Sequence, residues 1–128
     1  MRWAETSMQV LIADDFYTAR SRLKEILADA YPGVRFSEAA NGDEVMCHLA
    51  SSPCDLLLLD INMPGRNGID VLKDVKRVYP QLPVLIVSFH SREYYAARCL
   101  AAGAAAYINK DDALEELVPA ARKILQEN

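Results

Sequence analysis

The feature that most constrains this fold is a repeated change from short apolar segments to longer amphipathic ones. Three apolar segments, residues 10–12, 56–59 and 84–87, contain no polar residue. A strand exposed on one face alternates apolar and polar residues, whereas an uninterrupted apolar strand is buried on both faces, as in a parallel sheet covered by helices. The pattern therefore predicts an α/β protein with a buried parallel sheet.

Five strands, each followed by a helix, are predicted, and this arrangement is typical of a doubly wound α/β fold. The length of 128 residues fits one domain over residues 1–128, with a core at about 8–126. Gly103 is expected to end the fourth helix, and Pro119 is expected to kink the last one. The expected strands span residues 8–13, 34–39, 55–59, 84–87 and 105–108, and the expected helices span residues 16–30, 42–50, 69–79, 92–102 and 113–125.

Composition excludes some classes of function. The net charge is −4 and the basic residues are scattered, which argues against nucleic-acid binding by this chain alone. Cys47, Cys54 and Cys99 form no CxxC pair, so we expect reduced thiols in a cytoplasmic protein. No signal peptide or membrane span is predicted.

Residues capable of chemistry follow the apolar strands. Asp14 and Asp15 follow the first strand, Asp60 follows the third, and Ser88 follows the fourth. Ligands of open parallel sheets bind beyond the carboxyl ends of the strands. We therefore expect these side chains to surround one crevice, which Lys110 would reach after the fifth strand.

This set of residues is suited to phosphoryl transfer. Poorly solvated carboxylates repel one another, and a hard divalent cation such as Mg²⁺ removes that repulsion. One carboxylate can then attack phosphorus as a nucleophile. The metal and Lys110 would offset the charge of the phosphoryl oxygens, while the Ser88 hydroxyl would donate a hydrogen bond to one of them. The residue types thus predict phosphorylation of an aspartate.

Several residues also permit a purely structural interpretation. Asp60 could open a turn, and Asp14 with Asp15 could cap a helix. Lys110 could be a solvated loop residue, and Tyr107 could belong to the core. It is the combination of these residues at one sheet edge that favours the chemical interpretation.

The combination of Asp14-Asp15, the segment DINMPGRNG that begins at Asp60, Ser88, Tyr107 and Lys110 resembles the receiver domains of two-component response regulators. The resemblance covers about residues 9–125. It implies a flavodoxin-like sheet in the strand order 2-1-3-4-5. It also implies that Asp60 accepts a phosphoryl group from a sensor histidine kinase, and that the chain is no enzyme beyond phosphorylating itself and slowly losing that group.

Metal-binding roles are implied by the same resemblance. The carboxylates of Asp15 and Asp60 and the backbone carbonyl of Asn62 would bind Mg²⁺, or Mn²⁺, directly. Asp14 would act largely through water.

The resemblance further implies a switch pair and three rate-modulating positions. The Ser88 hydroxyl would move toward the phosphoryl group while the Tyr107 ring turns inward. Asn62 and His90 would influence how long the aspartyl phosphate lasts. Phe89 stands where a small residue is common, so its ring would narrow access to the acceptor.

Residues 103–125 look most like receivers joined to helix-turn-helix domains. We therefore expect homodimerisation on phosphorylation, and DNA contact only through a C-terminal output domain outside these residues. The surface made by the fourth helix, fifth strand and fifth helix is the expected site for a dimer partner or an output domain. A stand-alone receiver is the alternative. Two other functions stay open: a magnesium phosphatase, against which Asn62 stands where a second catalytic Asp is needed, and a binding module that works without phosphorylation.

Overall fold

The computed structural model describes residues 8–126, whose strands form one parallel sheet in the order β2-β1-β3-β4-β5. This order confirms the predicted doubly wound fold. In the register, Leu57 pairs with Leu11 on one side and with Val84 on the other. The strands are β1 (Gln9–Ala13), β2 (Arg35–Ala39), β3 (Leu56–Leu59), β4 (Val84–Ser88) and β5 (Ala106–Asn109).

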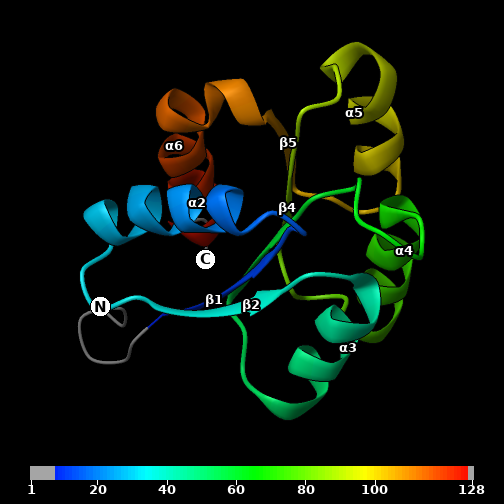
Figure 1. The fold of residues 1–128 in the computed structure, drawn as a ribbon, viewed down its shortest axis with the longest axis horizontal. Coiled ribbons are helices and arrows are strands. Elements are labelled where there is room, and N and C mark those ends of the chain that lie inside the picture. Colours follow the sequence, from blue (N-terminus) through cyan, green and yellow to red (C-terminus); the bar gives the residue numbers. More distant parts are fainter. Residues whose placement is uncertain (1–7, 127–128) are drawn as a thin grey trace.

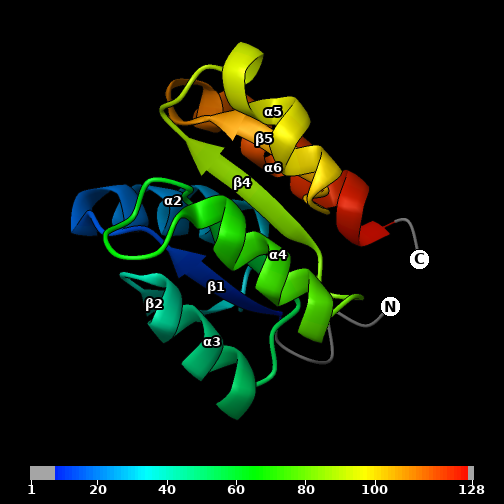
Figure 2. The same cartoon turned by 90° about the vertical axis from the view of Figure 1, so that its right-hand side faces the viewer.

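Helices cover both faces of the sheet. Helices α2 and α6 lie on one face and α3, α4 and α5 on the other, as Figures 1 and 2 show from two directions. Every predicted boundary lies within one residue of the observed one. The helices are α2 (Tyr17–Ala30), α3 (Gly42–Ser51), α4 (Gly68–Val78), α5 (Arg92–Ala101) and α6 (Ala113–Gln126), with a short 3₁₀ helix, η1 (Lys110–Asp112), before α6.

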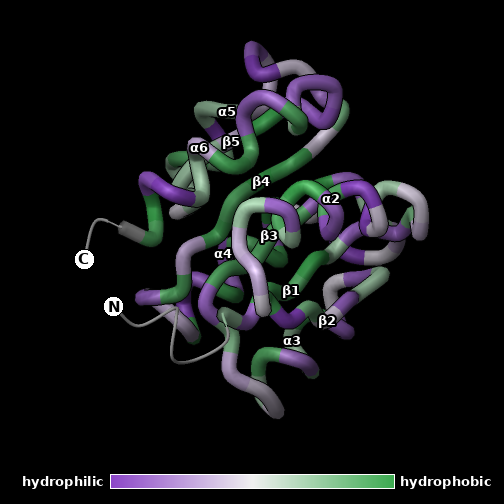
Figure 3. The backbone as a smooth tube through the Cα atoms, turned by 90° about the vertical axis from the view of Figure 1, so that its left-hand side faces the viewer, coloured by the Kyte–Doolittle hydropathy of each residue, from purple (hydrophilic) through white to green (hydrophobic). Residues whose placement is uncertain are grey.

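The sheet separates two apolar cores, because successive residues of a strand point to opposite faces. Leu57 and Leu59 pack into the core under α3, α4 and α5, whereas Leu56 and Leu58 pack into the core under α2 and α6. None of the four is more than 1% exposed. Double burial therefore explains the run of four leucines in β3, and Figure 3 shows the apolar strands passing through the middle of the molecule.

Two helix features predicted from single residues can be compared with the structure. Gly103 follows Ala102, the C-cap residue of α5, and has a φ of +110°, a left-handed conformation that glycine adopts without strain. This confirms its role in ending the helix. Helix α6 continues through Pro119 to Gln126, so the kink stays a prediction. Within residues 8–126, no helix has the length and apolarity that a membrane span requires.

Candidate functional site

The carboxyl ends of β1 and β3 bring the three predicted acidic residues together. Asp14, Asp15 and Asp60 each offer a carboxylate oxygen, and these oxygens lie within 4.8 Å of one another. Lys110, at the start of η1, reaches the same place: its Nζ forms an ion pair with Asp14 Oδ2 and lies 3.3 Å from Asp60 Oδ2. The structure therefore assembles these four residues at one sheet edge.

Burial makes the charges of this site costly. Asp14 is 1% exposed, Asp60 4% and Lys110 8%. Burial raises the pKa of Asp60 above its ordinary value, and the nearby charge of Asp14 raises it further. The Asn62 N–H, which donates to Asp60 Oδ1 at 3.0 Å, and the Lys110 ammonium oppose this rise in pKa. One ammonium among three carboxylates leaves the site short of positive charge.

The donor set fits a divalent metal ion. Asp14 Oδ1 accepts a hydrogen bond from the Phe16 N–H at 2.9 Å, an arrangement that stabilises the β1–α2 turn and leaves the other oxygen to Lys110. Asp15 Oδ1 is buried and has no hydrogen-bond partner among the described residues. Mg²⁺ and Ca²⁺ bind oxygen ligands, and a buried carboxylate oxygen with no hydrogen-bond donor is available as one. The acidic cluster can therefore hold a hard cation.

The loop after Asp60 depends on close backbone packing at Gly68. The Gly68 N–H donates to the Ile61 carbonyl oxygen at 3.2 Å. A Cβ atom at position 68 would lie 2.2 Å from the Ile61 Cα. Only glycine lets the start of α4 approach the chain so closely. Gly68 lies within the motif that begins at Asp60, but its packing role could not be predicted from the motif alone.

The predicted switch residues lie around the β4–α5 loop. Ser88 is fully buried, and its Oγ accepts a hydrogen bond from the His90 N–H at 3.1 Å. Tyr107 is 2% exposed, and its hydroxyl donates to the His90 carbonyl oxygen at 2.7 Å. Burial raises the pKa of the Tyr107 hydroxyl. The tyrosine ring therefore lies inside the protein in this structure, bonded to the loop that follows Ser88.

Phe89 borders the site from the solvent side. Its side chain is 64% exposed, and the centre of its ring lies 4.9 Å from Lys110 Nζ, a distance typical of a cation–π contact. An open groove begins here and extends along α2, with Phe16, Arg22 and Asp111 among its lining residues. Lys110 also lines this groove.

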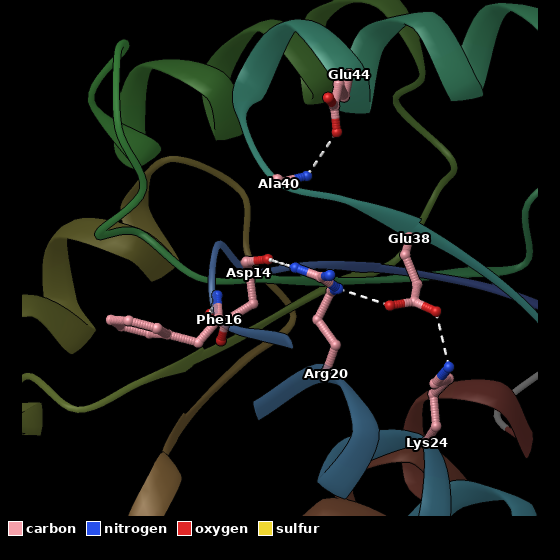
Figure 4. Close-up of polar contacts among 7 residues, drawn as sticks. All are labelled: Asp14, Phe16, Arg20, Lys24, Glu38, Ala40 and Glu44. Carbon is pink, nitrogen blue, oxygen red and sulfur yellow. Dashed lines mark hydrogen bonds and ion pairs between the residues drawn. The ribbon is translucent and has the colours of Figure 1, made fainter. Parts of the chain in front are cut away.

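Two residues beside the site were not predicted. Arg20 Nη1 donates to the backbone carbonyl oxygen of Asp14 at 2.7 Å, and Arg20 Nε donates to Glu38 Oε1 at 2.6 Å (Figure 4). Arg20 lies on α2 and Glu38 on β2. No local sequence signal connects them, because the contact forms only once β2 lies beside β1.

The sequence matches the response regulator receiver domain family over residues 10–122. The transcriptional regulatory protein DegU of Brevibacillus brevis is 30% identical over 122 residues, which cover 95% of this chain and 52% of that protein. The DNA-binding transcriptional regulator NtrC of Salmonella typhimurium is 38% identical over 109 residues, 85% of this chain and 23% of that protein. The chain thus spans between about a quarter and about half of the length of these relatives.

Solved structures agree with this match. A putative response regulator from Chloroflexus aurantiacus has a TM-score of 0.86 at 28% identity, over 94% of this chain and 98% of the other. A LuxR-family two-component response regulator from Aurantimonas has a TM-score of 0.82 at 26% identity, over 94% and 86%. The strand order, the acidic sheet edge and these matches together show that the chain belongs to the family of response regulator receiver domains.

Proposed function

We propose that this receiver domain accepts a phosphoryl group on Asp60 from the phosphohistidine of a sensor histidine kinase, in a reaction that requires Mg²⁺ or Mn²⁺. One observation carries the proposal: Asp60 is buried at a sheet edge beside two further carboxylates and a buried ammonium. The open groove beside Lys110 supports it, because a kinase domain would approach the site there.

The residues that would hold the metal are the carboxylates of Asp15 and Asp60 and the backbone carbonyl of Asn62, with Asp14 acting through water. When bound, the ion would offset negative charge on the carboxylates and on the phosphoryl oxygens. The unpartnered Oδ1 of Asp15 supports this assignment.

In the proposed step, an Asp60 carboxylate oxygen attacks phosphorus as the P–N bond of the phosphohistidine breaks. The electron pair of that bond returns to the imidazole nitrogen. Lys110, which lies 3.3 Å from Asp60, would move its ammonium onto a phosphoryl oxygen, and the Ser88 hydroxyl would donate to another. The chain would take part in its own phosphorylation and slow dephosphorylation, and would turn over no other substrate.

Phosphorylation would change the surface formed by α5, β5 and α6. It adds a charge of about −1.5 to −2 and three acceptor oxygens. Drawing Ser88 toward these oxygens would disturb its bond with the His90 N–H, and the His90 carbonyl also accepts from Tyr107. On the outside of α5, Tyr94 is 76% exposed and Leu100 is 46% exposed. This surface would form the homodimer or contact an output domain.

Three side chains would set the rates of this cycle. Phe89 would do so through its contact with Lys110. The His90 ring packs against the Tyr95 ring at a tilt of 49°, with ring centres 4.6 Å apart, and Asn62 is exposed beside the acceptor. His90 and Asn62 would affect how readily water reaches the aspartyl phosphate.

The relatives DegU and NtrC are named as transcriptional regulators. We infer by this likeness that the chain regulates transcription, with DNA bound by a helix-turn-helix output domain and not by the receiver. The exchange would take place in the cytoplasm, where Cys47, Cys54 and Cys99, free in the structure, would stay reduced.

A small phosphodonor, acetyl phosphate, tests the proposal with the purified chain. We expect intact-mass spectrometry to show one phosphoryl group on the wild type in the presence of Mg²⁺ and none after chelation. Asp60→Asn should take up none, whereas the control Asp43→Asn, which alters an exposed acid on α3, should behave as the wild type. Equal uptake by Asp60→Asn and the wild type would show that Asp60 is not the acceptor.

A further inference from the structure

Arg20 connects three segments that meet beside the acidic cluster (Figure 4). Its guanidinium donates from Nη1 to the Asp14 carbonyl oxygen at 2.7 Å and from Nε to Glu38 Oε1 at 2.6 Å. The arginine side chain is 16% exposed. A guanidinium is a rigid planar fork, so two such bonds hold it in one orientation. Arg20 therefore joins α2 to the end of β1 and to β2.

The bonded carbonyl belongs to the peptide group between Asp14 and Asp15. A peptide group is planar, so holding its carbonyl oxygen also fixes the direction of the following N–H and Cα. On the other side, the Asp14 N–H donates to the Ala39 carbonyl oxygen at 3.0 Å. The backbone that leads into Asp15 is thus held from β2 and from α2.

The Asp15 carboxylate depends on this backbone for its direction. Its Oδ1 is buried and has no hydrogen-bond partner among residues 8–126. Within these residues, no hydrogen-bond donor holds that oxygen in its position facing Asp14 and Asp60. The direction of the carboxylate therefore depends on the backbone at Asp15, which Arg20 holds through the peptide group before it and the Phe16 N–H holds from the other side through Asp14 Oδ1.

We propose that Arg20 is a positioning residue for the metal site, and that Glu38 anchors its guanidinium so that the peptide group before Asp15 stays in place. Hydrogen bonds from Lys24, and to a lesser extent from Arg20, hold the pKa of Glu38 below its ordinary value. The Glu38 carboxylate that anchors Arg20 therefore stays ionised. The inference rests on the proposed function, since it assumes that the acidic cluster binds a divalent ion.

Lys24 provides a matched comparison within the same network. Its Nζ donates to the other oxygen of Glu38, Oε2, at 2.7 Å. Its hydrogen bonds within the described residues are to Glu38 and not to the β1–α2 turn. Replacing Lys24 therefore removes a positive charge and an ion pair with Glu38, as replacing Arg20 does, but leaves the Asp14 carbonyl bonded.

The test is direct binding of Mg²⁺ by isothermal titration calorimetry to the wild type, Arg20→Met, Arg20→Lys and Lys24→Met. Loss of a residue that orients a metal ligand typically weakens affinity by about 10- to 100-fold. We expect Arg20→Met to bind Mg²⁺ about tenfold more weakly. Arg20→Lys should also bind weakly, because one ammonium cannot replace both arms of the fork. Lys24→Met should stay within about twofold of the wild type.

Thermal unfolding without metal shows whether each variant folds. If Arg20→Met unfolds, the conservative Arg20→Lys carries the test. Affinity equal to that of the wild type in Arg20→Lys would overturn the positioning role, because charge alone would then suffice. Equal weakening by Arg20→Met and Lys24→Met would overturn it too.

Phosphoryl uptake by the same proteins separates this inference from the proposed function. If the wild type takes up no phosphoryl group, the proposed function fails whatever Arg20 does. If the wild type is phosphorylated and the Arg20 variants bind Mg²⁺ normally, only the positioning role fails. A wild type that binds no Mg²⁺ would contradict the metal site and this inference together.

Discussion

Among single residues, Asp60 is the one whose charge costs the folded protein most clearly. Burial and the neighbouring carboxylate of Asp14 raise its pKa, and the Lys110 ammonium, shared with Asp14, offsets only part of that cost. Such a site trades stability for reactivity, because a phosphoryl acceptor must stay ionised in a poorly solvated place.

Asp60→Asn is therefore expected to stabilise the protein. The neutral amide keeps an oxygen that can accept from the Asn62 N–H but removes one of three crowded carboxylates. We predict a gain of about 1 kcal/mol in the free energy of unfolding at neutral pH, measured by urea denaturation without magnesium. A lower urea midpoint in Asp60→Asn would contradict the account of the site's charge.

The pH dependence of this gain has a definite sign. Because the folded-state pKa of Asp60 is raised, the native state binds its proton more tightly than the unfolded chain, and stability falls as pH rises between the two pKa values. The advantage of Asp60→Asn should therefore be full above the folded-state pKa and absent below the ordinary aspartate pKa. Asp74 is the opposite case, because a hydrogen bond from Arg66 lowers its pKa. Asp74→Asn should therefore lose stability relative to the wild type as pH rises through the range between the two pKa values of Asp74.

Phe89→Ala is expected to speed phosphoryl uptake from acetyl phosphate. The ring engages the Lys110 ammonium, which must turn to the phosphoryl oxygens during the reaction. An exposed cation–π contact contributes about 0.5–1 kcal/mol, so the initial rate should rise about two- to fivefold. Phe16→Ala, which removes another exposed aromatic ring from the same groove, should leave the rate unchanged. An unchanged or slower rate in Phe89→Ala would show that its ring does not restrain Lys110.

At the scale of secondary-structure elements, the loop from β3 to α4 is the most tightly constrained connection of the site. Gly68 at the start of α4 packs directly on the backbone of Ile61, which follows Asp60. Backbone atoms cannot give way as a flexible side chain can, so this contact fixes where α4 begins relative to the acceptor.

Gly68→Ala should lower the free energy of unfolding by about 2–3 kcal/mol, because the added methyl group collides with the Ile61 backbone. Asp70→Ala provides a control in the first turn of the same helix, at an exposed position without this contact. Chemical denaturation of both variants measures the difference. If Gly68→Ala were as stable as Asp70→Ala, the close approach would not constrain the loop.

Sequence predicted the elements well because burial of the sheet on both faces leaves uninterrupted apolar strands such as Leu56–Leu59. Turn residues such as Gly103 then predicted the ends of the helices to within one residue. The convergence of Asp14, Asp60 and Lys110 could also be predicted, since parallel strands end at the same sheet edge.

Side-chain contacts between distant elements could not be predicted. The bonds from Arg20 to Glu38 and to the Asp14 carbonyl depend on rotamers that form only on the folded backbone. The same holds for the Phe89 ring over Lys110 and for the hydrogen bond from the Tyr107 hydroxyl to the His90 carbonyl oxygen. An apolar pattern determines which face a residue occupies but leaves open which polar partner it finds there.

Across the whole molecule, two cores on opposite faces of the sheet hold the acidic edge and the α5–β5–α6 surface in one framework. The three cysteines of this framework differ in how far they are exposed to solvent. Cys47 is exposed, Cys54 is half-buried and Cys99 is fully buried. Burial also raises the pKa of Cys54 and of Cys99, which disfavours their reactive thiolates.

Thiol labelling of the native protein should follow this order. We expect a thiol reagent at neutral pH to modify Cys47 first, Cys54 more slowly and Cys99 last, since Cys99 reacts only when the core opens. Peptide mapping over time measures the order, and Cys47→Ser should remove the fast phase alone. Early modification of Cys99 would show that the core under α5 is open in solution.

The central claim is that Asp60 carries the phosphoryl group. Borohydride reduces an acyl phosphate to the alcohol, which converts a phosphorylated aspartate into homoserine and marks its position. After phosphorylation with acetyl phosphate and Mg²⁺, followed by reduction and peptide mass spectrometry, we predict homoserine at position 60 alone. Homoserine at position 14 or 15 would contradict the claim. So would a protein that has taken up phosphate but contains no homoserine after reduction.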